Sequence, residues 1–206
     1  MNKGLGSAVH LAHMFIGEVL TRGGSAVDAT AGNGYDTLFL ARRVGPSGHV
    51  YAFDVQKQAL LKTHKLLEKH GLARQVTLFQ AGHEEMDRLV YSPVDAVLYN
   101  LGYLPGGDHT LITRPETTIA SLRAAVKLLR RGGRIGLVGY PGHPGGEAEC
   151  NAVIQFAAGL DRALYNVIKI SLLNRAVNAP EVILIEEGSG NNESKESTQN
   201  AGGTSE

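Results

Sequence analysis

The feature that most constrains the fold is a regular alternation of short apolar runs with longer helical patterns. Five runs of strand length occupy residues 25–31, 49–54, 76–80, 94–100 and 134–140. Between them, residues 35–44, 56–70, 83–90 and 115–130 carry apolar side chains at helical spacing. Strands buried on both faces are typical of parallel sheets, and strand–helix alternation builds such sheets through right-handed crossovers. The sequence therefore predicts a doubly wound α/β fold.

The pattern changes after Tyr140. A helix is expected at about 146–159, followed by strands at about 163–170 and 181–187 with no helix between them. This ending predicts an antiparallel C-terminal strand, which is typical of a Rossmann-like methyltransferase sheet of class I. Residues 188–206 are mostly Gly, Ser, Asn, Glu and Thr, too polar to offset the entropy of ordering. We expect one domain at residues 1–187 and a disordered tail at 188–206.

Composition limits the partners and the compartment. Twenty basic residues balance twenty acidic ones, so only local basic patches could gather a nucleic acid. The single cysteine, Cys150, forms no internal disulfide and suits a reducing cytosol. The apolar stretch at residues 8–20 is interrupted by His10, His13 and Glu18 and is shorter than a bilayer span. The chain is therefore expected to be cytoplasmic, with no membrane segment.

A glycine-rich turn follows the first predicted strand, in the run Val-Asp-Ala-Thr-Ala-Gly-Asn-Gly-Tyr-Asp at residues 27–36. Such a turn places a ligand at the carboxyl ends of the strands. A dinucleotide fingerprint needs a third glycine, where this chain has Thr37. The carboxylates of Asp28 and Asp36 would repel a pyrophosphate but attract the ammonium and sulfonium of S-adenosylmethionine. The turn therefore favours the methyl donor, although Asp36 could simply cap the next helix.

Two further strand ends complete a nucleoside site. Asp54, about 20 residues beyond the turn, is placed to accept hydrogen bonds from both ribose hydroxyls. The third strand leads into His83, which could stack on the adenine or bind its edge, or could only open a helix. Asp54 is compatible with NAD as well as with a methyl donor. The turn and the sheet pattern decide between them.

The fourth strand ends in Asn100-Leu-Gly-Tyr103, a relaxed version of the Asn-Pro-Pro-Tyr motif of amino-group methyltransferases. In that motif the Asn oxygen and a backbone carbonyl accept hydrogen bonds from the target amine, and the aromatic ring stacks on the target base. Leu101 and Gly102 depart from the motif and weaken any inference to a planar exocyclic amine. The alternative is a strand-end Asn followed by a structural tyrosine.

Three motifs together resemble the MnmM (YtqB-like) family, long labelled rRNA methylases. They are Asp28-Ala-Thr-Ala-Gly-Asn-Gly-Tyr-Asp36-Thr-Leu-Phe-Leu-Ala41, Asn100-Leu-Gly-Tyr-Leu-Pro-Gly-Gly-Asp108 and Tyr140-Pro-Gly-His-Pro-Gly-Gly146. The resemblance runs from about residue 10 to 187. It implies methylation of 5-aminomethyl-2-thiouridine at the tRNA wobble position, with the anticodon stem-loop as the partner, and it suggests a homodimer. The predicted donor site comprises Asp28, Gly32, Asn33, Gly34, Asp36, Asp54, Gln56, His83 and Asn100.

On the acceptor side, the resemblance implies that Asn100, Gly102 and Tyr103 face the amine. An alkyl amine must lose a proton before it can attack, and Asp108, His109 and His143 are the candidate bases. We predict Asn100, Tyr103 and Asp108 as the catalytic residues. Methylation of rRNA or of a small amine, and a catalytically idle nucleotide- or RNA-binding module, remain the alternatives.

The remaining charged and histidine residues fit a soluble surface as well as a site. The cations available to tRNA are Arg42, Arg43, Arg114, Arg130, Arg131 and Arg134. His10 and His13 lie one helical turn apart but have no cysteine or acidic neighbours in sequence, so no metal is predicted.

Overall fold

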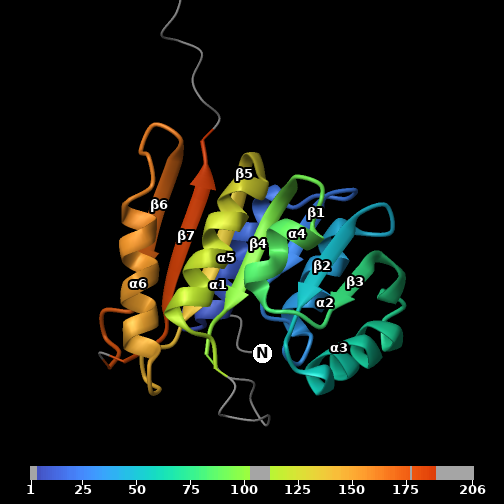
Figure 1. Ribbon diagram of the computed structural model, residues 1–206, viewed down its shortest axis with the longest axis horizontal. Coiled ribbons are helices and arrows are strands. Elements are labelled where there is room, and N and C mark those ends of the chain that lie inside the picture. Colours follow the sequence, from blue (N-terminus) through green and yellow to red (C-terminus); the bar gives the residue numbers. More distant parts are fainter. Residues whose placement is uncertain (1–3, 103–111, 177, 189–206) are drawn as a thin grey trace, which may run out of the picture.

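The computed structural model describes residues 4–102, 112–176 and 178–188, which form a seven-stranded sheet with helices on both faces (Figure 1). The strand order is β3-β2-β1-β4-β5-β7-β6. The strands are β1 Ser25–Asp28, β2 His49–Phe53, β3 Val76–Phe79, β4 Val94–Asn100, β5 Leu129–Gly139, β6 Tyr165–Ile170 and β7 Glu181–Glu187. Strands β1 to β5 pair in parallel, whereas β7 runs antiparallel to both β5 and β6. The predicted fold class and its antiparallel ending are confirmed.

In the described part of the chain, six α-helices cover the two faces of this sheet. On one face lie α1 Ala8–Val19, α2 Tyr35–Val44 and α3 Lys57–Lys69, and on the other α4 Met86–Leu89, α5 Pro115–Leu128 and α6 Gly146–Ala158. Alternate strand residues belong to the two cores: Leu98 lies in the same core as Ile16 and Leu40, while Tyr99 lies in the other core with Leu122. Each fully buried side chain of this size contributes roughly 1.5–3 kcal/mol. The continuous apolar character of the strands follows from burial on both faces.

The largest differences from the predicted boundaries occur at three elements. Strand β1 ends at Asp28 rather than at residue 31, because the Asp28 carboxylate accepts a hydrogen bond from the Thr30 amide and turns the chain out of the sheet. The predicted helix 83–90 is a 3₁₀ turn at His83–Glu85 followed by α4. Strand β5 starts at Leu129, directly after α5, with a register irregularity opposite Val94.

Helix α1 precedes the alternating pattern and packs across β4, β5 and β7. Its N-terminus is capped by Ser7, whose hydroxyl accepts a hydrogen bond from the His10 amide at 3.2 Å. None of the described helices combines the length and apolar character that a membrane crossing requires. Except for Gly188, the predicted tail lies outside the described residues, so the division at residue 187 stays a prediction.

Candidate functional site

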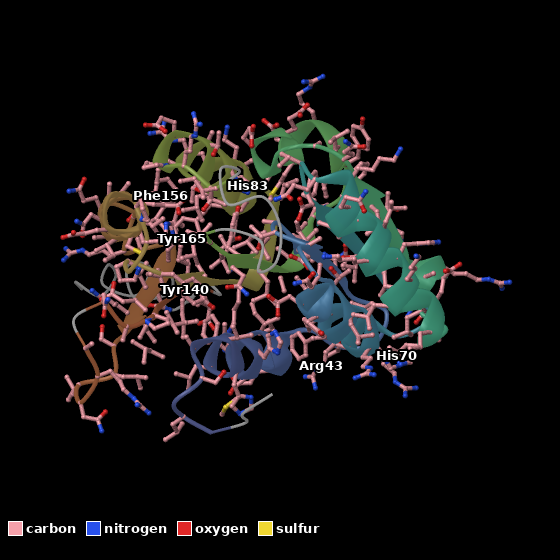
Figure 2. All side chains as sticks on the ribbon, turned by 90° about the horizontal axis from the view of Figure 1, so that it is seen from below. Arg43, His70, His83, Tyr140, Phe156 and Tyr165 are labelled. Carbon is pink, nitrogen blue, oxygen red and sulfur yellow. The ribbon has the colours of Figure 1, made fainter. Side chains whose placement is uncertain are left out.

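A cavity of about 940 Å³ opens at the carboxyl ends of the parallel strands. Figure 2 views this edge, with His83 and Tyr140 near the middle and Arg43 and His70 toward the rim. Loops after β1, β2, β3, β4 and β5 all contribute to the lining. Cavities of this size hold ligands as large as a nucleoside derivative, and the position is the one expected for a ligand of a doubly wound sheet.

The glycine turn is held against α3. Gly32 and Gly34 have positive φ angles of 52° and 84°, and the Thr63 hydroxyl donates to the Gly32 carbonyl at 3.1 Å. A Cβ on Gly34 would lie 2.9 Å from the Thr63 backbone, so a larger residue would push the turn away from α3. Gly32 lines the cavity whereas Gly34 does not. The structure therefore supports a packing role for Gly34, and its predicted contact with the donor stays a prediction.

Asp28 is likewise turned inward and does not line the cavity. Its Oδ1 accepts from the Thr30 amide at 3.0 Å and its Oδ2 accepts from the Thr37 hydroxyl at 2.5 Å. Burial, reinforced by the negative charge of Asp36, raises the pKa of Asp28 to about 7. Asp28 therefore shapes the turn, and its predicted contact with a cationic donor is not supported by its position.

Asp54 joins the turn to the second strand end. Its Oδ2 accepts from the Gly32 amide at 2.9 Å, and its Oδ1 accepts from the Gln56 amide at 2.8 Å. Burial raises the pKa of Asp54, partly offset by these two backbone donors. Each carboxylate oxygen retains a second lone pair, so the fixed carboxylate can still accept hydrogen bonds from a diol in the cavity.

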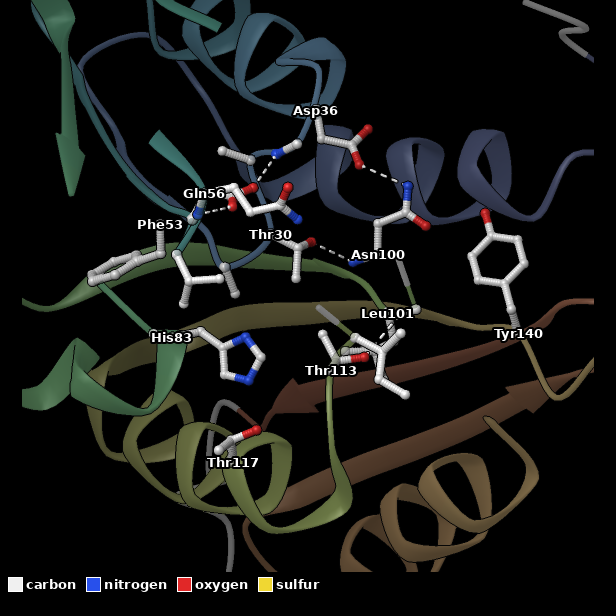
Figure 3. A pocket seen from close by; sticks show the side chains of 18 of the residues that line it. Thr30, Asp36, Phe53, Gln56, His83, Asn100, Leu101, Thr113, Thr117 and Tyr140 are labelled. Carbon is white, nitrogen blue, oxygen red and sulfur yellow. Dashed lines mark hydrogen bonds between the residues drawn. The ribbon is translucent and has the colours of Figure 1, made fainter. Parts of the chain in front are cut away.

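His83 is a buried imidazole that faces the cavity (Figure 3). Burial lowers its pKa, which favours the neutral ring at physiological pH. One side of the ring is bonded to the Ala29 backbone, while Nε2 has no hydrogen-bond partner among the described residues. A buried polar atom without a partner is uncommon. A neutral Nε2 next to a bonded Nδ1 can accept a hydrogen bond from a ligand amine.

Asn100 lies on the opposite side of the cavity, at the end of β4 (Figure 3). Its backbone amide donates to the Thr30 hydroxyl at 2.7 Å, and its Nδ2 donates to Asp36 Oδ2 at 3.4 Å. Tyr140, at the end of β5, also lines this side, and burial together with the charge of Asp36 raises its pKa. A hydrogen-bond acceptor, a carboxylate and a protonated phenol therefore meet here.

Gly102 and Thr113, which flank residues 103–111, are joined by a polar network that we call the neck. The Gly102 amide donates to the Thr113 hydroxyl at 2.8 Å, and the Thr113 amide donates to the Gly102 carbonyl at 3.0 Å. Glu149 on α6, almost fully buried, accepts from the Thr113 and Thr118 hydroxyls, both at 2.7 Å. The three predicted residues Tyr103, Asp108 and His109 lie outside the described residues.

Most of the predicted donor residues do meet in the cavity. Seven of them line it: Gly32, Asn33, Asp36, Asp54, Gln56, His83 and Asn100. The candidate base His143 lines it too, and its Nδ1 lies 3.0 Å from the Pro144 carbonyl. Their assignment to particular ligand atoms stays a prediction.

The sequence reading missed other lining residues, notably Thr30, Tyr140, Thr113 and Asn178. Tyr140 could have been found, because it ends a predicted strand next to the other strand-end residues. Asn178 comes from the segment between β6 and β7 and had no such signal. No group of three or more potential metal ligands occurs within the described ranges.

Three of the predicted cations, Arg114, Arg130 and Arg134, differ in their surroundings. Arg114 lines the cavity. Arg130 is paired with Asp95 at 3.0 Å, and Arg134 with Glu18 and Glu186, both at 2.6 Å. Arg134 therefore ties α1 to β7, which limits its use for an RNA phosphate.

Comparison with known proteins identifies relatives along most of the chain. A family described as "Putative rRNA methylase" matches residues 50–186. A tRNA (mnm(5)s(2)U34)-methyltransferase, chloroplastic, of Arabidopsis thaliana is 39% identical over 86% of this chain and 68% of its own length. The crystal structure of a Clostridium thermocellum protein described as "putative rRNA-methylase" superposes with a TM-score of 0.87 at 41% identity, over 89% of this chain and 99% of that one. A Streptococcus mutans protein described as "a putative methyltransferase", solved in complex with SAH, gives a TM-score of 0.81 at 36% identity over 89% of this chain and 99% of that one.

Proposed function

Because this chain belongs to the rRNA methylase family of S-adenosylmethionine-dependent methyltransferases, we propose that it methylates the amine of 5-aminomethyl-2-thiouridine at the tRNA wobble position. The product is 5-methylaminomethyl-2-thiouridine. The observation that carries this substrate is the similarity, along most of the chain, to the Arabidopsis tRNA (mnm(5)s(2)U34)-methyltransferase.

The donor half of the cavity fits S-adenosylmethionine. The Asp54 carboxylate would hold the ribose hydroxyls, and the unpartnered Nε2 of His83 would accept from the adenine amine. Asp36 places a carboxylate in the cavity, which favours a cationic donor over a pyrophosphate. When bound, the donor supplies an electrophilic methyl group on sulfur. The chain must aim the amine at this group.

The acceptor half fits an amine. In the reaction the nitrogen lone pair forms the new N–C bond, the C–S bond breaks with its electron pair going to sulfur, and the resulting ammonium loses a proton. The Asn100 oxygen can accept an N–H of the amine, and such orientation supplies much of the rate. Burial in the cavity lowers the pKa of the amine and raises its nucleophilic fraction. Among the described candidate bases, His143 lines the cavity.

The anticodon stem-loop is the proposed partner, because a single-stranded loop can present a splayed base to a pocket. Arg114 is the charged group best placed to meet its phosphate backbone.

We also propose a homodimer, which sedimentation of the purified chain would test. A cytoplasmic location agrees with the single cysteine, whereas the Arabidopsis relative carries the word chloroplastic in its name. The compartment therefore does not follow from the family alone.

The test uses the purified chain, labelled S-adenosylmethionine and anticodon stem-loops analysed by nucleoside mass spectrometry. A loop that carries 5-aminomethyl-2-thiouridine should gain one methyl group. A loop with unmodified uridine should gain none, because it has no nucleophilic nitrogen. The rate should rise with pH as the amine deprotonates and then level off. Methylation of small-subunit rRNA or of the unmodified loop would overturn the proposal.

A further inference from the structure

A chain of three side chains links α1 to the acceptor side of the cavity. His13 Nε2 lies 2.7 Å from Asp36 Oδ1, and Asp36 Oδ2 accepts the hydrogen bond from Asn100 Nδ2. The side chains of His13 and Asp36 are only 15% and 12% exposed. The His13 ring is stacked on Phe39 at 3.9 Å between centroids with an interplanar angle of 3°. His13 is thus fixed in place, although it is absent from the cavity lining.

The hydrogen bonds among His13, Asp36 and Asn100 determine which end of the Asn100 amide faces the cavity. An ionised carboxylate only accepts hydrogen bonds. The Asn100 amide presents its Nδ2 to Asp36 Oδ2 at 3.4 Å, which leaves Oδ1 for the cavity. A flipped amide would direct N–H groups at the substrate amine and lose the bond to Asp36. The contact with His13 supports the bond by holding the other carboxylate oxygen.

On the basis of the function proposed above, we propose that His13 is a positioning residue for methyl transfer. It acts through Asp36 and keeps the Asn100 oxygen directed at the acceptor amine. A residue of α1, which precedes the first strand, would thus support the reaction at the end of the fourth strand.

The kinetic test compares His13→Phe, which can still stack on Phe39 but lacks the nitrogen, with His13→Gln, whose side-chain amide can again donate to Asp36. His13→Phe should lower kcat by about tenfold with the affinity for S-adenosylmethionine within twofold of the parent, since a small misalignment is enough for such a loss. His13→Gln should recover most of the rate. His10→Phe makes the same change one turn earlier, away from Asp36 and outside the cavity lining, and should leave the rate unchanged.

A double-mutant cycle then tests the route. In an Asn100→Ala background, His13→Phe should cause no further loss of rate, because the amide that it positions is gone. Equal losses in the two backgrounds, or a loss of donor affinity that matches the loss of rate, would overturn the proposal.

A second readout does not depend on the acceptor. The side-chain amide protons of Asn100, assigned in NMR spectra by their loss in Asn100→Ala, should shift toward free-amide values in His13→Phe but not in His10→Phe. Unchanged resonances would refute the role of His13 whatever the substrate is. If the parent chain fails to methylate the modified stem-loop while these resonances shift as expected, the proposed substrate is wrong and the positioning role stands.

Discussion

The two halves of the cavity are held by different kinds of contact. On the donor side, Asp54 bonds to the Gly32 and Gln56 amides, so the ends of two neighbouring strands and their own turns fix the site. On the acceptor side, the neck at Gly102 depends on Glu149 of α6, and Asn100 depends on Asp36 of α2. The proposed donor side is held by local contacts, whereas the proposed acceptor side is assembled from helices on both faces of the sheet.

This difference predicts which substitutions should affect donor binding and which should affect methyl transfer to the acceptor. Changes at Asp54 or at the Gly32 turn should alter the affinity for the methyl donor. Changes on α1 or α6, which are distant in sequence from Asn100, should alter the acceptor step with little effect on donor binding. Four variants separate the two halves, and the first has the largest expected effect.

Asn100→Ala removes the acceptor oxygen and should lower kcat on the order of 100-fold, since loss of orientation at the reacting atom has effects of this size. Calorimetric affinity for S-adenosylmethionine should stay within a few-fold of the parent, although Asn100 also lines the donor side. Asn166→Ala on the exposed β6 strand is the matched control. A fall in donor affinity as large as the fall in rate would erase the distinction between the halves.

Asp54→Ala should weaken donor binding by tenfold or more, because each hydrogen bond to a carboxylate is worth roughly 1.5–3 kcal/mol. Saturating donor should restore most of the rate, since the acceptor side is intact. Calorimetry and rates at high donor concentration measure the two effects. Asp87→Ala, on the exposed side of α4, should change neither, and an unchanged affinity of Asp54→Ala would exclude Asp54 from the site.

Asp28→Asn tests whether Asp28 shapes the turn rather than binds the donor. Its raised pKa means that the folded state holds a proton more tightly than the unfolded state. The parent therefore loses stability as the pH rises from about 4 to about 7, at up to roughly 1.4 kcal/mol per pH unit for this group. The Asn variant lacks this loss, so denaturant titrations should show it gaining stability relative to the parent between pH 5 and 8. A constant difference across that range would contradict the shifted pKa.

Glu149→Gln should have the smallest effect. The amide can keep one of the two threonine bonds, and the loss of one net hydrogen bond is worth about 0.5–1.5 kcal/mol. The KM for the stem-loop should rise about threefold, a ratio within that energy range, while donor affinity and kcat should be nearly unchanged. Glu147→Gln, exposed on the same helix, is the control. A selective loss of donor affinity would mean that the neck does not belong to the acceptor half.

The sequence placed seven of the predicted donor residues at the cavity, whereas Tyr103, Asp108 and His109 on the proposed acceptor side lie outside the described residues. The glycine turn, Asp54 and His83 follow strands in order along the chain, and parallel strands bring their carboxyl ends to one edge. The same rule predicted that Asn100, at the end of the fourth strand, would lie at this edge of the sheet. It could not distinguish Asp28, which faces inward, from Asp36, which faces the cavity, because side-chain direction in an irregular turn follows from local hydrogen bonds.

The sequence by itself determined the doubly wound sheet, its antiparallel ending and the edge at which a ligand binds, since apolar periodicity and strand–helix order allow few other arrangements. Only the tertiary structure decided that His13 meets Asp36 and that Glu149 meets Thr113 at the neck. These pairs are separated by 23 and 36 residues respectively. Their contact depends on how α1 and α6 lie across opposite faces of the sheet, which is fixed by packing in the two cores rather than by any local pattern.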